Sequence, residues 1–164
     1  MKFAGTVDIA APRDKVWAFV IDPNQVGQCG PGVETIEVID DTHFKATAKV
    51  GIGFISARFV VNMEMAELTP PDQAVIKAHG QAPGSAVDAT AHMTLSAGAN
   101  GDTRMDWSAD VTISGSLASL GARLIEGTAN KMIGQTFDCM KSKLEAESSG
   151  EPRRGAPPST SESV

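Results

Sequence analysis

Residues 116–147 constrain the fold of this chain most, because they read as one unusually long amphipathic helix. Ser114 or Ser116 can cap its start, since a short hydroxyl side chain accepts a hydrogen bond from an unpartnered N–H group of the first turn. At about 1.5 Å per residue, the helix would be about 45 Å long. We therefore expect it to span the whole domain and the preceding chain to wrap around it.

The apolar side of this helix drifts around its axis, which favours a helix lying obliquely on a curved, twisted sheet over a bundle seam. Three glycines, Gly121, Gly127 and Gly134, lie within it, and each is less favourable there than alanine by about 1 kcal/mol. Two interpretations remain open, and both can hold: close packing of helix on sheet or mild kinking of the helix, or space kept free for a ligand.

The chain before this helix is expected to form mostly strands, because its apolar residues alternate with polar ones. A first strand (2–10) precedes two short helices, which begin at Pro12 and at Asp22-Pro23 and end by about Gln28. The other predicted strands are 33–39, 43–50, 55–68, 73–80, 86–97 and 103–114. Hairpin-length links make these six an antiparallel meander, whose edge the first strand joins. The predicted fold is α+β, a seven-stranded curved sheet around a long C-terminal helix.

Composition and charge limit the possible functions. The 164 residues carry a formal net charge of −6 without a basic stripe, so a nucleic-acid partner is not expected. Neither a signal peptide nor a run of about 20 apolar residues is present. Two cysteines without metal-type spacing fit a reducing cytoplasm. We expect a soluble domain over 1–147 and a disordered polar tail over 148–164.

The inward faces of the predicted strands are rich in alanine, and the chain has no tyrosine and two tryptophans. Interiors normally fill to a packing density of about 0.75, so such a face either leaves an apolar cavity under the helix or packs its small residues tightly. We expect a cavity, with flexible methionines in its wall. The predicted lining is Phe44, Ala57, Phe59, Val61, Met63, Ala89, Ala91, Met93, Met105, Trp107, Leu117, Leu120, Leu124, Met132 and Ile133.

Catalytic and metal sites are not expected. The alternation places no paired carboxylates inward, the histidines at 43, 79 and 92 fall outward or at a turn, and none has metal-pair spacing. Cys29 is the one candidate reactive group. No histidine or lysine lies near it in sequence to lower its pKa, so an inert thiol is the preferred interpretation. The pattern favours binding over chemistry.

Several motifs, in this order, resemble the CoxG family of carbon monoxide dehydrogenase accessory proteins, which belongs to the START-like/Bet v 1-like (SRPBCC) superfamily. They extend over most of residues 3–144: Ala11-Pro12-Arg13, Val16-Trp17, Asp22-Pro23, Cys29 with Pro31-Gly32, the segment 49–59, and Leu120 to Ile125. The resemblance implies a helix-grip fold with a hydrophobic cavity. It also implies a non-enzymatic accessory protein that recruits a molybdenum CO dehydrogenase to the inner face of the cell membrane.

Because the electron acceptor of such an enzyme dissolves in the bilayer, we hypothesise that the cavity carries an isoprenoid quinone such as menaquinone. Ser56, Thr128 and Thr136 are polar enough to donate a hydrogen bond to its head group. Ile52, Phe54 and Ile55 form either a loop tip that inserts into the membrane or a buried hairpin end. The alternatives are a structural adaptor without ligand, a polyketide aromatase or cyclase, and a general fatty-acid or sterol carrier.

Overall fold

The computed structural model describes residues 1–53 and 55–148. The predicted disordered tail, apart from residue 148, lies outside the described residues. The elements are β1 (Lys2–Ile9), α1 (Arg13–Val20), α2 (Pro23–Gly27), β2 (Val33–Val38), β3 (His43–Ile52), β4 (Ile55–Thr69), β5 (Gln73–Ala82), β6 (Ser85–Ala97), β7 (Thr103–Gly115) and α3 (Ala122–Ser148). Two 3-10 turns, η1 (Ala99–Gly101) and η2 (Ser116–Leu120), flank β7.

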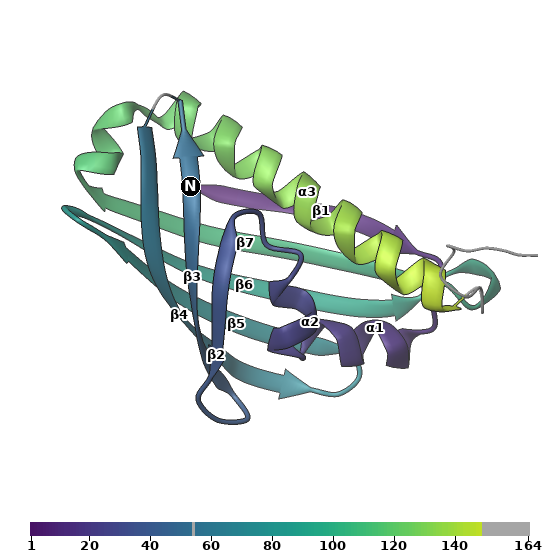
Figure 1. Cartoon of the computed structure of the whole chain (residues 1–164). Coiled ribbons are helices and arrows are strands. Elements are labelled where there is room, and N and C mark those ends of the chain that lie inside the picture. The colour runs from purple at the N-terminus through teal and green to yellow at the C-terminus, as the bar shows by residue number, and fades with distance from the viewer. Residues whose placement is uncertain (54, 149–164) are drawn as a thin grey trace, which may run out of the picture.

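Within the described residues the strands form one seven-stranded antiparallel sheet in the order β1-β7-β6-β5-β4-β3-β2. The first strand joins the far edge of the meander, where β1 pairs with β7 from Lys2 opposite Asp110 to Ile9 opposite Thr103. The sheet curves around α3, which crosses its concave face obliquely, while α1 and α2 lie beside the C-terminal half of that helix (Figure 1). The predicted helix-grip fold is therefore confirmed.

The predicted start of the long helix is wrong. Residues 116–120 form the 3-10 turn η2, and α3 begins only at Ala122. The break is at Gly121, whose φ of 98° lies in the left-handed region that side-chain-bearing residues rarely adopt. Neither Ser114 nor Ser116 therefore caps α3.

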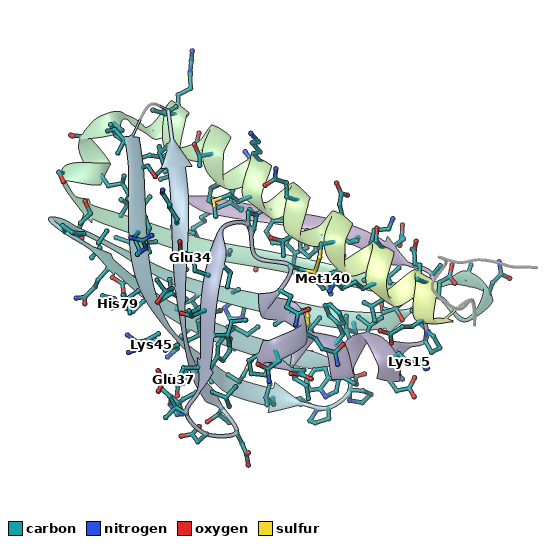
Figure 2. The ribbon with its side chains drawn as sticks, viewed as in Figure 1. Lys15, Glu34, Glu37, Lys45, His79 and Met140 are labelled. Carbon is teal, nitrogen blue, oxygen red and sulfur yellow. A yellow bond between two sulfur atoms is a disulfide. The ribbon has the colours of Figure 1, made fainter. Side chains whose placement is uncertain are left out.

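The predicted faces of the strands are confirmed by side-chain burial. On β3, Phe44 and Ala46 are buried, whereas His43 between the turn and Phe44 is exposed. The convex face is polar: Figure 2 shows His79, Lys45 and Glu37 directed away from the helix. There His79 Nδ1 lies 2.6 Å from Asp88 Oδ1 across β5 and β6.

The interior differs between the two ends of the sheet. At the end near α1, the buried side chains form one large cluster, which we call the packed cluster. At the other end a smaller buried cluster, Ile52, Phe59 and Leu117, is surrounded by partly buried aliphatic residues. The interior is thus more densely filled at the end near α1 than at the end near Ile52 and Leu117.

Cys29 is not a free thiol, which corrects the sequence-based interpretation. It forms a disulfide with Cys139 of α3, with the two Cα atoms 5.4 Å apart. The bond ties the loop after α2 to the C-terminal half of the helix, next to the packed cluster. Because disulfides are rare in reducing compartments, the cysteine content no longer supports a cytoplasmic location.

Candidate ligand cavity

A cavity of about 250 Å³ lies between the N-terminal half of α3 and the concave face of the sheet. It exists because several positions on this face carry alanine or glycine, whose side chains do not reach α3. Cross-strand pairing brings these small residues together: Ala78 on β5 is opposite Ala89 on β6, and Gly80 is opposite Val87. The wall consists of Ala48, Val50, Ile52, Phe59, Val61, Ala78, Gly80, Val87, Ala89, Val111, Ile113, Leu117, Ile125, Thr128, Ala129 and Met132.

Among the described residues, the cavity wall contains no ionisable side chain, and its one hydroxyl already has an acceptor. Thr128 Oγ1 donates to the Leu124 carbonyl of the preceding turn at 3.1 Å. Thr136, outside the wall, donates in the same way to the Met132 carbonyl at 2.8 Å. Neither threonine has a hydroxyl proton left for a ligand, so the role expected for them in holding a head group lacks support. A wall of this kind suits a hydrocarbon chain.

A second, open pocket of about 510 Å³ adjoins the cavity, and we call it the vestibule. Its lining is Ile55, Ser56, Ala57, Arg58, Phe59, Ala82, Pro83, Ser85, Ser116, Leu117, Ser119 and Leu120. Phe59 and Leu117 line both spaces and are only 6% and 7% exposed. These two side chains therefore lie at the boundary between the cavity and the vestibule, which we call the partition.

The charged groups near this end of the sheet form an exposed pair. Arg58 donates from Nε and Nη2 to the two carboxylate oxygens of Glu34, at 2.8 and 3.1 Å. The hydrogen bond from Arg58 lowers the pKa of Glu34, and the same bond raises the pKa of Arg58. The two opposite charges of the pair balance each other, and both side chains lie outside the apolar cavity.

The structure brings together some of the predicted lining residues and separates others. Phe59, Val61, Ala89, Leu117 and Met132 line the cavity. Ala57 and Leu120 line the vestibule, whereas Leu124 is 41% exposed and lies next to Gly53 of the β3–β4 hairpin. The other seven lie outside the cavity wall: Phe44, Met63, Ala91, Met93, Met105, Trp107 and Ile133.

Three of the seven residues outside the wall lie in or next to the packed cluster near α1. Met93 and Met105 are in the cluster near α1, and the Trp107 ring lies 5.3 Å from the Phe137 ring. Contact between any of the predicted residues and a ligand stays a prediction.

Most wall residues that the prediction missed are small or aliphatic residues near one end of their strands. Strand alternation places Val50, Val87, Val111 and Ile113 on the inward face, so the signal for their orientation was present. The sequence pattern did not indicate which end of the sheet would remain hollow.

The β3–β4 hairpin is divided between the interior and the surface. Ile52 is 6% exposed and lines the cavity, so it follows the buried alternative and is not available to a membrane. Ile55 is 38% exposed, and its membrane contact stays a prediction. Phe54 lies outside the described residues.

Neither close packing nor space for a ligand explains Gly127 and Gly134 of α3, and mild kinking at these glycines stays a prediction. A Cβ atom built at Gly127 or Gly134 would have no neighbour within 4 Å among the described residues. Both positions are exposed and outside the cavity wall. They are therefore not required for close packing or for the volume of the cavity.

Metal-ligating and membrane-spanning features are both absent from the part of the chain that the structure describes. No group of three metal-ligating side chains is present there. No helix within the same residues is long and apolar enough to cross a membrane.

The fold is that of known START-like and Bet v 1-like proteins. A conserved protein from Geobacillus kaustophilus superposes with a TM-score of 0.82 at 20% identity, covering 88% of this chain and 95% of that one. The Zhui aromatase/cyclase from Streptomyces sp. R1128 gives 0.67 at 14% identity, covering 90% and 94%. A START superfamily protein from Mycobacterium smegmatis gives 0.66 at 12% identity, covering 89% and 98%.

Sequence comparison is more specific about the family. No curated protein matches the sequence. The family model of CoxG, a subunit of carbon monoxide dehydrogenase, matches residues 5–145, which is most of the chain. The protein therefore belongs to the carbon monoxide dehydrogenase CoxG family.

Proposed function

We propose that this protein is a non-enzymatic accessory protein of a molybdenum CO dehydrogenase, and that it carries an isoprenoid quinone between the cell membrane and that enzyme. The observation that carries the proposal is the cavity beneath α3, whose wall contains no ionisable side chain among the described residues. Family membership supports the partner enzyme, since the family is described as a subunit of carbon monoxide dehydrogenase. Peripheral contact with the membrane is part of the proposal, because the ligand dissolves there.

The size of the cavity indicates how such a ligand would bind. At about 250 Å³, it is smaller than the sites of about 300–1,000 Å³ that enclose drug-sized ligands. Only part of a prenyl chain would fit inside, and the rest of the ligand would continue into the vestibule. Burial from water stabilises by about 25 cal/mol per Å² of apolar surface. A chain that moves from a bilayer to an apolar cavity gains little of this energy, so its transfer would be reversible in both directions.

The cavity favours binding over catalysis. An activity like that named for the aromatase/cyclase relative would be favoured by an acid or base in the wall, but the described wall residues include neither. Two carboxylates of β6 and β7, Asp88 and Asp106, lie on the convex face, as the predicted alternation places them. Asp88 is bonded to His79, and Asp106 accepts a hydrogen bond from Thr6 at 2.7 Å.

A transfer assay tests the proposal. The purified protein is incubated with vesicles that contain an isoprenoid quinone, the vesicles are removed, and the quinone left with the protein is measured. We expect close to one quinone per chain and, after addition of the reduced dehydrogenase, its reduction. No quinone above the protein-free control would contradict the proposal and leave the adaptor function. Uptake of phospholipid or fatty acid in place of quinone would point to a general lipid carrier.

A further inference from the structure

We infer that the vestibule is a binding site for the polar head of the ligand, and that this head is uncharged and carries hydrogen-bond acceptors such as carbonyl oxygens. The inference rests on the proposed function in one respect: a hydrophobic tail must occupy the adjoining cavity. It goes further by assigning a second site and the chemistry of the group that the site accepts.

The vestibule is a gap in the wall of the sheet. On one side, β4 pairs with β3 along its whole first half, down to Ile55 opposite Ile52. On the other side, its pairing with β5 begins only at Val60, opposite Gln81. Residues 55–59 therefore have no strand neighbour on the β5 side within the described chain, and the gap opens from the surface to Phe59 at the cavity.

This gap exposes main-chain groups that can bind a ligand. Ile52 and Ile55 are separated by two residues, so they form the hydrogen-bonded pair that closes the hairpin. Hydrogen bonding to the two neighbours alternates along an antiparallel strand. The backbone groups of Ser56 and Arg58 therefore point away from β3, towards the gap. Each provides one donor and one acceptor next to the partition.

The opposite wall of the vestibule is held in place by serine hydroxyls. Ser85 Oγ accepts a hydrogen bond from the Leu117 amide at 2.9 Å and lies 3.2 Å from Ser116 Oγ. Ser119 Oγ donates to the Ser116 carbonyl at 2.5 Å. These bonds fasten η2 to the start of β6 and so fix Leu117 at the partition. Ser116 Oγ also donates to the Gly84 carbonyl at 3.4 Å, so the hydroxyl protons of this wall are occupied.

Ser56 differs from these serines. Its hydroxyl has no hydrogen-bond partner among the described residues, and it lines the vestibule on β4 beside the free backbone groups. A hydroxyl supplies one donor and two acceptor lone pairs. Ser56 is therefore the side chain available to donate to a ligand oxygen.

Charge decides between an uncharged and an anionic head. Among the described residues, Arg58 is the one ionisable side chain in the lining of the vestibule. Two of its donors are committed to Glu34 in a bidentate pair. The charge of Arg58 is thus already balanced by Glu34, so a carboxylate or phosphate head would gain little attraction from it. A carbonyl oxygen needs only the free donors of Ser56 and the β4 backbone.

Two probes with the same tail separate this inference from the proposed function. One is a quinone that carries two isoprene units, and the other is the isoprenoid hydrocarbon of the same length without a head. Dissociation constants are measured by titration calorimetry for the full chain, for Ser56→Ala, and for Ser108→Ala, a matched control on an exposed position of β7 outside the vestibule.

We expect the quinone to bind the full chain more tightly than the hydrocarbon does. Because one hydrogen bond contributes about 1 kcal/mol, Ser56→Ala should weaken quinone binding roughly fivefold and leave hydrocarbon binding unchanged. Ser108→Ala should change neither. If the hydrocarbon binds and Ser56→Ala leaves both probes unaffected, the head-group site is refuted and the carrier function stands. If neither probe binds, the proposed function fails with it. A fatty acid that binds more tightly than the quinone would refute an uncharged head.

Discussion

Filling the cavity with a larger side chain should stabilise this protein, although the same change in a packed core destabilises. Ala89 lines the cavity, and Ala89→Leu would add three carbons to space that is empty. At about 0.8 kcal/mol for each buried CH₂ group, the gain is about 2 kcal/mol. The cavity of about 250 Å³ leaves room for these carbons. Filling it also removes part of the cost of empty volume, which is about 24 cal/mol per Å³.

The matched control is Ala74→Leu on β5. Ala74 is 2% exposed and belongs to the packed cluster near α1. Extra carbons there force neighbouring side chains out of their rotamers at a cost of about 1–3 kcal/mol. The two variants carry the same chemical change in the same sheet, so the sign of the stability change reports whether space is available.

Thermal and denaturant unfolding of the ligand-free protein measure the difference. For a chain of this size, 1 kcal/mol shifts the melting temperature by about 2–4 °C, so Ala89→Leu should raise it by about 4–8 °C. Ala74→Leu should lower it. Ala89→Leu should also abolish uptake of the quinone in the vesicle assay. Equal destabilisation by both variants would refute an empty cavity at Ala89.

Four other perturbations test separate parts of the structure. Replacing Cys29 and Cys139 together by alanine opens a covalent loop with a sequence separation of 110, and chemical denaturation should show a loss of about 4 kcal/mol. Gly127→Ala should stabilise the protein by about 0.5–1 kcal/mol in the same assay, because the position is helical and no atom lies near a Cβ there. Gly32→Ala should destabilise the protein, since its φ is +78° and the Lys49 carbonyl occupies the place of a Cβ atom. The hydrogen bond from the Thr42 amide, and then that from the His43 side chain, hold the pKa of Asp40 below its ordinary value of 3.8. The ionised Asp40 therefore stabilises the folded state above pH 3.8, and this stabilisation is lost as the pH falls through the lower pKa of the folded state. Asp40→Asn should reduce the dependence of unfolding on acid pH.

The architecture was predictable because strand alternation and helical spacing are local signals. The alternation on β3 and β6 placed Phe44 and Ala89 on the correct face without any structure. The boundary between η2 and α3 was not predictable in the same way. Gly121 reads equally as a glycine inside a helix or as a break, and only its backbone conformation decides.

The sequence predicted the type of site, an apolar cavity, but only some of the residues that line it. Alanine-rich inward faces correctly indicated an apolar cavity. Its place depends on how far α3 stands from each part of the sheet, which is a property of the whole fold. For the same reason Met93 and Met105 belong to the packed end, and Ile52 belongs to the cavity. The disulfide was missed because nothing in the local sequence brings Cys29 next to Cys139.

Native mass spectrometry of the purified protein, followed by organic extraction of whatever it carries, tests the central claim most directly. The account predicts a hydrophobic molecule at close to one per chain, with the mass of an isoprenoid quinone, that is absent from Ala89→Leu. A protein that is empty as purified and takes up no quinone from vesicles would contradict it.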